Sequence, residues 1–187
     1  MKIEKKEIVL KNGQSCVLRS PEKEDAEQLV KFVKTMAGET DFVLRYPEEA
    51  DIPVLQEEFF LQHFIEAERD VMILAEVDGK IAGNCQFSEI GKGRIKVRHR
   101  CSMAIGLYRD YWGLGIGKAL IQLLAEKAAE LGYEQMELEV VSSNARAIGL
   151  YTKMGFVKTG EIPKAIKYKD GTYDSVDIMV KDLRRVI

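Results

Sequence analysis

The chain has 187 residues, of which 46% are hydrophobic and 31% are charged, and its formal net charge is −2 at pH 7. This length and composition are typical of one globular domain with an adequate core, so we expect a single domain over residues 1–187. The small net charge provides no general field for nucleic acid or an anionic membrane, and we expect neither as a partner.

The cysteines and the N-terminal segment indicate the compartment. Cys16, Cys85 and Cys101 lack CxxC spacing, which argues against a disulfide framework or a zinc site. The segment MKIEKKEIVL is too charged for a signal peptide, and no apolar run reaches the length of a membrane span. The sequence therefore predicts a soluble cytoplasmic protein with reduced thiols and no metal.

Turn signals and hydrophobic periodicity predict two strands and two helices in the first part of the chain. Asn12-Gly13 is typical of a hairpin turn, and Ser20-Pro21 followed by acidic residues is typical of a helix start that the Ser20 hydroxyl caps. The expected elements are strands Glu7–Lys11 and Ser15–Arg19, a helix from Pro21 to Gly38, and a helix over Pro53–Glu68.

Three strands joined by tight turns are expected next, as an antiparallel meander. They are Val71–Val77, Lys80–Ile90 and Arg94–Leu107. Half of one face of the third strand is basic, with Arg94, Lys96, Arg98 and Arg100. We expect this face to be solvated, or else to bind an acidic acceptor or a partner chain.

The remainder of the chain alternates helices and strands, which makes the whole a mixed α/β domain. The expected elements are a helix ending at Leu131 before Gly132, a strand over Glu134–Val141, a helix over Asn144–Met154, and strands Phe156–Lys167 and Tyr173–Val180.

Between the meander and the following helix, glycines alternate at Gly113, Gly115 and Gly117, ahead of Lys118. Glycine lets a ligand approach the backbone closely and adopts positive φ with little penalty. A helix start also presents unpaired N–H groups and the positive end of the helix dipole, which favours a phosphate or diphosphate. The alternative is a tight connection that needs glycine only for its turn.

Two segments form a recognisable pair of motifs. Gly115-Ile116-Gly117 matches the glycine part of a signature Arg/Gln-x-x-Gly-x-Gly/Ala, with Trp112 where Arg or Gln is usual, and residues 144–156 match N-x-x-A-x-x-L-Y-x-x-x-G-F. In this order they resemble the GNAT superfamily of acyl-CoA-dependent N-acyltransferases, over roughly residues 16–183. The resemblance implies a mixed α/β fold with a central, mostly antiparallel sheet of about seven strands flanked by four helices, in which splayed central strands hold acetyl-CoA.

A dinucleotide-binding loop is the competing interpretation of the glycines. A G-x-G-x-x-G pattern that starts at Gly113 would need glycine where Lys118 stands. The loop also lies too late in the chain for a doubly wound sheet to follow it.

The resemblance implies acetyl-CoA as the donor and a primary amine as the acceptor. In relatives the pantetheine arm pairs with a strand edge, here expected where the strand ending at Leu107 separates from the strand beginning at Glu134. One backbone amide there polarises the thioester carbonyl, which is worth about 3 kcal/mol in comparable acyl transfers. The expected cofactor-binding residues are Ile105, Leu107, Trp112, Gly113, Leu114, Gly115, Ile116, Gly117, Lys118 and Asn144.

The resemblance also implies two catalytic residues. Glu139 is expected to accept the proton that the amine must lose, and Tyr151 is expected to protonate the departing thiolate. The alternatives are that Glu139 is a solvated strand residue, with His99 or water as the base, and that Tyr151 is an aromatic core residue. Asn144 is a helix cap or a contact to the cofactor or the adjacent loop.

The expected acceptor is a small molecule or polyamine. A protein or peptide amine is the alternative, and a CoA-binding sensor without turnover is a third hypothesis. Acidic residues between the first two helices could attract a cationic amine. They are Glu39, Asp41, Glu48 and Glu49. A homodimer would match the relatives, among which dimers are common.

Overall fold

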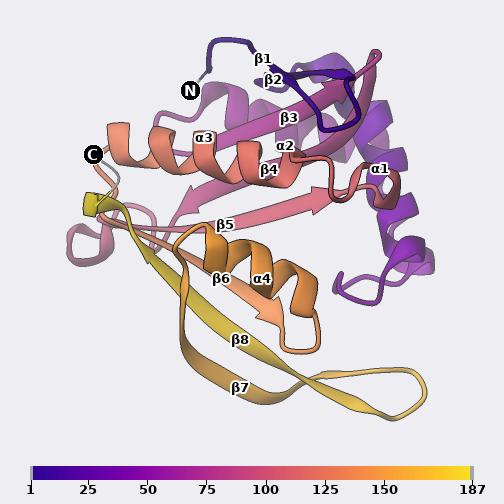
Figure 1. Ribbon diagram of the computed structural model, residues 1–187, viewed down its shortest axis with the longest axis vertical. Coiled ribbons are helices and arrows are strands. Elements are labelled where there is room, and N and C mark those ends of the chain that lie inside the picture. The colour runs from indigo at the N-terminus through magenta and orange to yellow at the C-terminus, as the bar shows by residue number, and fades with distance from the viewer. Residues whose placement is uncertain (1, 186–187) are drawn as a thin grey trace. The chain divides into compact units, whose positions relative to one another are not determined.

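The computed structural model describes residues 2–185 (Figure 1). The chain divides into two compact units, one formed by residues up to 88 together with 104–124, the other by 89–103 together with the chain from 125 onward. The division passes through strand β5 (Arg100–Leu107) and helix α3 (Ile116–Glu130), so both elements contribute to both units. That residues 1–187 act as a single domain stays a prediction.

The first unit begins with antiparallel strands and two helices. Its elements are β1 (Lys6–Val9), β2 (Ser15–Arg19), α1 (Ala26–Glu39), α2 (Val54–Glu66), β3 (Val71–Val77) and β4 (Lys80–Glu89), followed by the second half of β5 and the first part of α3. Strand β1 pairs antiparallel with β2, β2 with β3, and β3 with β4. At the β3–β4 turn Asp78 and Gly79 both have positive φ, 49° and 73°, as a two-residue hairpin turn requires.

A hydrophobic core joins α1 and α2 to β3 and β4, and Figure 1 shows these elements in purple and magenta. Its buried members are Ala26, Leu29, Phe32 and Met36 of α1, Leu61 and Phe64 of α2, Met72 and Leu74 of β3, and Ile81 of β4. The spacing of three or four residues along each helix is that of one buried helix face.

Two glycines allow the end of β5 to pack closely within the first unit. A Cβ on Gly83 would lie 2.5 Å from the Gly106 carbonyl oxygen, so no larger residue fits between β4 and β5 there. A Cβ on Gly106 would lie 3.2 Å from Met36 Cε and 3.3 Å from Phe32 Cζ. The C-terminal end of β5 is therefore held between β4 and α1.

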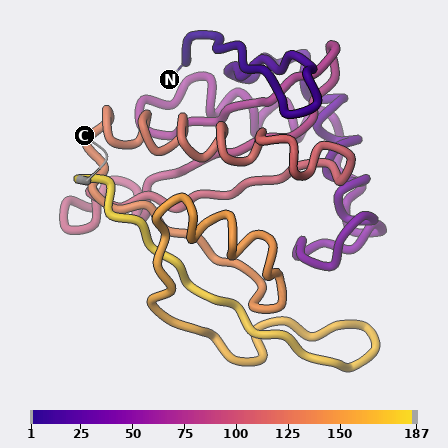
Figure 2. The backbone as a smooth tube through the Cα atoms, viewed as in Figure 1, coloured from indigo at the N-terminus to yellow at the C-terminus, as the bar shows by residue number. Residues whose placement is uncertain are grey.

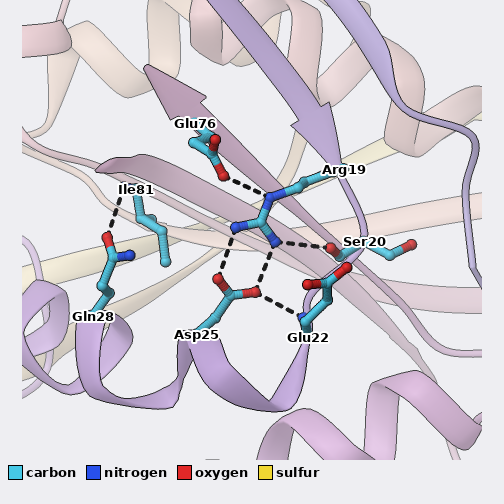
Figure 3. Close-up of polar contacts among 7 residues, drawn as sticks. All are labelled: Arg19, Ser20, Glu22, Asp25, Gln28, Glu76 and Ile81. Carbon is cyan, nitrogen blue, oxygen red and sulfur yellow. Dashed lines mark hydrogen bonds and ion pairs between the residues drawn. The ribbon is translucent and has the colours of Figure 1, made fainter. Parts of the chain in front are cut away.

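Arg19, the last residue of β2, links three elements of the first unit (Figure 3). Its guanidinium donates to both carboxylate oxygens of Asp25, at 2.7 Å each, and its Nε donates to Glu76 of β3 at 2.7 Å. Arg19 and Asp25 are both buried, and removing one member of such a pair leaves an uncompensated buried charge. The pair therefore fixes β2 and β3 against the residue that precedes α1.

The first helix begins later than predicted, because a 3₁₀ turn, η1 (Lys23–Asp25), precedes α1. The prediction that Ser20 caps the helix was wrong. Ser20 Oγ accepts a hydrogen bond from the Ile3 N–H at 2.8 Å, and the Asp25 carboxylate instead accepts from the Glu22 N–H at 2.7 Å. The carboxylate that Arg19 holds in place thus satisfies the backbone at this helix start.

The prediction of one strand from Arg94 to Leu107 was wrong at its start. Ile95–Val97 form a 3₁₀ turn, η3, and β5 begins only at Arg100. Gly91 and Gly93 both have positive φ, and the Arg94 N–H donates to the Gly91 carbonyl at 2.9 Å. The backbone after β4 therefore forms a turn, and Arg94, Lys96 and Arg98 do not lie on a strand face.

The second unit contains the first part of β5 and the last part of α3. It continues with β6 (Gln135–Val141), α4 (Ala145–Lys153), β7 (Val157–Lys167) and β8 (Tyr173–Asp182). The β5–β6 pairing is parallel and runs from Arg100↔Gln135 to Ser102↔Glu137, and β8 pairs antiparallel with both β6 and β7. Figure 2 follows β7, in orange-gold, and β8, in yellow, through their long hairpin.

Within residues 2–185 the structure has four α-helices and eight strands in the order β1-β2-β3-β4-β5-β6-β8-β7. The fold is mixed α/β with mostly antiparallel pairing, which confirms the predicted fold class, with one strand more than the resemblance implied. None of the helices in this part of the chain combines the length and the apolar character that crossing a bilayer requires.

Candidate active site

Two of the three alternating glycines between β5 and α3 have positive φ, whereas Gly117 is a residue of α3. A 3₁₀ turn, η4 (Arg109–Tyr111), precedes Gly113 and Gly115, whose φ angles are 80° and 104°. A Cβ on Gly115 would meet no heavy atom within 4 Å beyond the neighbouring residues, so glycine is needed there for its φ rather than for space. Since α3 begins at Ile116, the N–H groups of its first turn have no intrahelical carbonyl to bond.

Other parts of the first unit hold this loop. The Leu114 carbonyl accepts from the Lys11 N–H, next to β1, at 3.1 Å. The Arg109 N–H donates to Glu39 Oε2 at 2.9 Å, and the Arg109 guanidinium also donates to the Glu39 carbonyl. The loop is therefore tied to the β1–β2 hairpin and to the last residue of α1.

Trp112 stands where the family usually has Arg or Gln, and its side chain bonds within the protein. Its indole Nε1–H donates to the Leu107 carbonyl at 2.9 Å, and the Arg109 guanidinium carbon lies 5.6 Å from the indole ring centre. The indole thus ties the loop to the end of β5, where Ile105 and Leu107 are both half-buried. A direct contact of Trp112 with a cofactor stays a prediction.

A diphosphate fits this loop. An anion at the start of α3 would accept hydrogen bonds from backbone N–H groups and face the positive end of the helix dipole. The open space at Gly115 leaves the backbone accessible, and the exposed Lys118 adds a positive charge in the first turn. The residues able to hold such a group are those of the loop and first turn, Gly113–Lys118.

Asn144 and Lys181 satisfy the two ends of α4 in the second unit. Asn144 Oδ1 accepts from the Ala147 N–H at 3.1 Å, so the side chain caps the helix start. Lys181 Nζ donates to the Met154 carbonyl at 2.5 Å, next to the helix end, and burial lowers the pKa of this lysine. A contact between Asn144 and a cofactor stays a prediction.

Tyr151 lies near the end of α4 and is 8% exposed. Its ring packs edge-on against Phe156, with 5.9 Å between ring centres. Burial raises the pKa of Tyr151 to about 12. The phenol is therefore protonated at neutral pH. No residue of the described part of the chain forms a hydrogen bond with the hydroxyl, so its proton is not bound within the protein.

Glu139 is an exposed residue of β6, on the same strand face as Glu137. The two carboxylates differ in their surroundings. Arg100 donates two hydrogen bonds to Glu137 and thereby lowers the pKa of that carboxyl, whereas no side chain among residues 2–185 bonds to Glu139. The structure describes no hydrogen bond between Glu139 and Tyr151, and His99, the weaker candidate base, is exposed in the turn before β5.

Several acids between α1 and α2 serve the local structure. Glu39 accepts from the Arg109 N–H, and Glu49 accepts from the Tyr46 N–H at 2.9 Å in a 3₁₀ turn, η2 (Pro47–Glu49). Asp51 pairs with Lys34 at 3.0 Å. Of the four acids that the sequence predicted to attract a cationic amine, Glu39 and Glu49 are therefore used in contacts within the protein.

Glu57, an acid of α2 that is 6% exposed, was not among the residues predicted from the sequence. The signal was its spacing of four and seven residues from Leu61 and Phe64, which puts all three on one helix face. Glu57 was overlooked because acids early in a helix are common and are usually solvated.

In the described part of the chain, His, Cys, Asp and Glu side chains form no group of three or more that could hold a metal ion. A reaction without metal stays a prediction.

Known proteins are similar to this chain in sequence and in fold. The model of the Acetyltransferase (GNAT) family matches residues 38–156. The chain is 30% identical over 153 residues to an N-alpha-acetyltransferase of Sulfurisphaera tokodaii, covering 78% of this chain and 83% of that protein. It is similar to an acetyltransferase of the GNAT family from Streptococcus pneumoniae, with a TM-score of 0.84 and 29% identity over 89% of this chain and 99% of that one. For yncA from Salmonella typhimurium with its cofactor acetyl-CoA, the TM-score is 0.78 over 90% of this chain and 94% of that one, and the 18% identity supports the fold alone.

The family match covers more than half of the chain, and it includes the glycine loop and the whole motif of residues 144–156. The chain belongs to the acetyltransferase (GNAT) family, and it is an enzyme of the acyltransferase class.

Proposed function

We propose that the protein transfers the acetyl group of acetyl-CoA to a primary amine of a small molecule or polyamine, by direct attack in a ternary complex. The observation that carries this proposal is the Gly113–Lys118 loop at the start of α3, whose positive-φ glycines and helix N-terminus suit a diphosphate. Family membership supports acyl transfer as the chemistry, and the fold is similar to that of yncA, which was determined with acetyl-CoA.

The proposed binding residues act mainly through their backbone. Gly113, Leu114, Gly115, Ile116, Gly117 and Lys118 bind the diphosphate. Ile105 and Leu107 offer backbone groups to the pantetheine arm, and one amide at this strand end donates to the thioester oxygen as negative charge develops, worth about 3 kcal/mol. Trp112 and Asn144 support the loop and the start of α4.

Tyr151 is proposed to act as the general acid. The amine nitrogen forms a bond to the carbonyl carbon, and Tyr151 donates its proton to the sulfur as the C–S bond breaks. The raised pKa of about 12 keeps the phenol protonated and ready to donate. A phenolate of this pKa is a stronger base than a thiolate, so it takes a proton from the nitrogen as the amide forms. The products are the amide and the CoA thiol, and Tyr151 is protonated again.

Glu139 is proposed to accept the first proton from the acceptor, directly or through water. A lysine-like amine of pKa about 10.4 is neutral only about once in 10³ at pH 7, a handicap of roughly 4–5 kcal/mol. An exposed carboxylate that no neighbour engages can relay this proton, whereas Glu137 is held by Arg100.

A peptide or protein N-terminus is the second candidate acceptor. It is favoured by the similarity to the N-alpha-acetyltransferase of Sulfurisphaera tokodaii, which extends over 78% of this chain. A cytoplasmic location, a homodimer and the lack of nucleic-acid or membrane partners stay predictions.

Thiol release from acetyl-CoA, measured across free amines, a polyamine and peptides with free N-termini, tests the proposal. Transfer to free amines supports it, and transfer to peptides alone supports the second candidate. CoA binding without thiol release from any of these acceptors would contradict both, and would favour a CoA-binding sensor.

The Tyr151→Phe variant tests the general acid. We expect kcat to fall by about 10²–10⁴ while CoA affinity, measured by calorimetry, changes less than about twofold. Unchanged kcat would remove Tyr151 from the mechanism. The Glu139→Gln variant should change the pH dependence of kcat/KM, and an unaltered profile would assign the base elsewhere.

A further inference from the structure

Lys181 of β8 binds the end of α4 and pairs with no acid. Its ammonium group donates to the carbonyl of Met154, the residue that ends α4, at 2.5 Å. Within residues 2–185, no backbone N–H donates to that carbonyl, and no carboxylate pairs with Lys181. A cation at this place also faces the negative end of the helix dipole.

The ammonium group lies close against Gly155, the residue after the helix cap. A Cβ on Gly155 would lie 3.1 Å from Lys181 Nζ, and the φ of Gly155 is 87°. Glycine therefore allows the chain to turn here and leaves room for the ammonium group. Burial lowers the pKa of Lys181, as expected for an amine that is partly withdrawn from water.

The same face of β8 binds the chain at both ends of α4. Asp177 accepts a hydrogen bond from Ser142 Oγ at 2.5 Å, just before the helix, and Lys181 binds its last carbonyl. Asp177 and Lys181 are four residues apart on one strand, so their side chains lie on one face. The helix is thus attached to the strand at two points, of which Lys181 is the one near Tyr151.

Tyr151 belongs to the turn that Lys181 binds. Its carbonyl accepts from the N–H groups of Met154 and Phe156, at 3.0 Å each, and its ring packs against Phe156. The hydroxyl has no hydrogen-bond partner in the described part of the chain. The position of the phenol therefore depends on the backbone of this turn and on the packing of its ring.

We propose that Lys181 is a positioning residue for Tyr151. Its hydrogen bond to the Met154 carbonyl holds the last turn of α4 on β8, and thereby fixes the phenol for proton donation to the sulfur. A displacement of about 1 Å at a reacting group is enough to cost about 10² in rate. This inference rests on the proposed function and adds to it a residue that acts only through Tyr151.

The test is a double-mutant cycle in the full-length protein. Lys181→Met keeps an unbranched side chain and removes the charge and the N–H donors, and it is made with and without Tyr151→Phe. Lys153→Met is the matched control. Lys153 is an exposed residue in the last turn of α4, so this variant removes a positive charge from the same helix end without removing the bond to Met154.

The measurements are kcat and KM for the best acceptor among free amines, a polyamine and peptides, and CoA affinity by calorimetry. We expect Lys181→Met to lower kcat by about 10- to 100-fold when Tyr151 is present. In Tyr151→Phe, which has no phenolic proton to position, it should lower kcat by less than about twofold. Lys153→Met should change kcat by less than about twofold, and CoA affinity should be the same in all variants.

Three results would overturn the inference and leave acetyl transfer intact. Unchanged kcat in Lys181→Met would show that the bond positions no reacting group. An equal loss of kcat with and without Tyr151 would make Lys181 a structural residue whose effect does not pass through the phenol. A loss in Lys153→Met as large as that in Lys181→Met would assign the effect to charge at the helix end.

Failure of the proposed function gives different results. Unchanged kcat in Tyr151→Phe alone refutes the general acid, and this inference with it, while transfer itself continues. No transfer by the wild-type protein to any amine refutes the proposed function and the inference together. If Lys181→Met does not fold, Lys181→Gln, which is uncharged and one atom shorter, takes its place and must lower kcat only where Tyr151 is present.

Discussion

Arg100 clamps Glu137 across the parallel β5–β6 pair, with Nε 2.5 Å from Oε1 and Nη2 2.8 Å from Oε2. Gln135 adds a donor to Glu137 Oε1 at 2.7 Å. Arg100 belongs to the first pair of the described register, Arg100↔Gln135, and Glu137 to the last, Ser102↔Glu137, so the ion pair crosses the described pairing diagonally. A bidentate contact of this kind fixes the relative orientation of the two side chains more strictly than a single hydrogen bond.

The Glu137→Gln variant should lower the free energy of unfolding at pH 7 by about 1–3 kcal/mol, because it removes a charge-assisted pair that is partly shielded from water. Denaturant titration measures this change. The hydrogen bonds from Arg100 lower the pKa of Glu137, so the contribution is present above the pKa of the unfolded state and is lost as the pH falls through the lower folded value.

Glu161→Gln provides the matched control for Glu137. Glu161 pairs with Lys158 at 2.8 Å on an exposed part of β7, where water and salt screen the charges and such a pair contributes little to stability. Equal losses of stability in the two variants at pH 7 would contradict a special role for the Arg100–Glu137 pair.

The sequence predicted the fold class and most elements because they depend on local signals. Strand β3 has the predicted bounds, Val71–Val77, since a run of apolar residues ends at an Asp-Gly turn. The strand expected from Arg94 was wrong because its alternating residues lie after two positive-φ glycines, which turn the backbone instead of extending it.

Hydrogen-bond partners and side-chain burial at several positions depend on tertiary contacts, which sequence patterns do not reveal. The partner of the Trp112 indole is a carbonyl five residues away, and the Asp25 carboxylate that caps a turn is also bound by Arg19. Glu57 shares its residue type with many solvated acids, and its burial depends on how α2 packs on α1. Local patterns give no information on such contacts.

The Gly115→Ala variant should weaken CoA binding, because alanine at a φ of 104° strains the backbone that is proposed to bind the diphosphate. We expect about a tenfold or greater loss in affinity by calorimetry. Gly132→Ala is the control, since Gly132 has a φ of 79°, lies after α3, and likewise has open space around a Cβ.

Both glycine variants should lose similar stability, about 1–2 kcal/mol, from the same backbone strain. Only Gly115→Ala should lose CoA affinity. A parallel loss of affinity in Gly132→Ala would indicate that the effect comes from general destabilisation and would contradict phosphate binding at Gly115.

Trp112 is the single tryptophan of the chain and should report CoA binding directly. Its indole N–H is tied to the Leu107 carbonyl and its ring lies beside Arg109, so an anion bound at the adjacent loop should change its fluorescence. Titration with CoA measures this change, and Trp112→Phe, which lacks the signal, should still bind CoA by calorimetry. Binding heat without any fluorescence change would place the ligand away from this loop.

Tyr151 should make stability fall at alkaline pH. The unfolded phenol ionises at a pKa of about 10, while burial holds the folded one at about 12. Above pH 10 the unfolded state loses the proton first and gains stability, so the free energy of unfolding falls between about pH 10 and 12, by up to roughly 2–3 kcal/mol.

The Tyr151→Phe variant isolates this contribution, because phenylalanine keeps the ring packed against Phe156 and removes only the ionisable hydroxyl. The difference in unfolding free energy between the two proteins, measured by denaturant titration from pH 8 to pH 12, should be constant up to about pH 10. Above that pH the difference should shift in favour of the variant. Parallel curves over the whole range would mean that the Tyr151 hydroxyl is hydrated in the folded state, which would also weaken its assignment as a shielded proton donor.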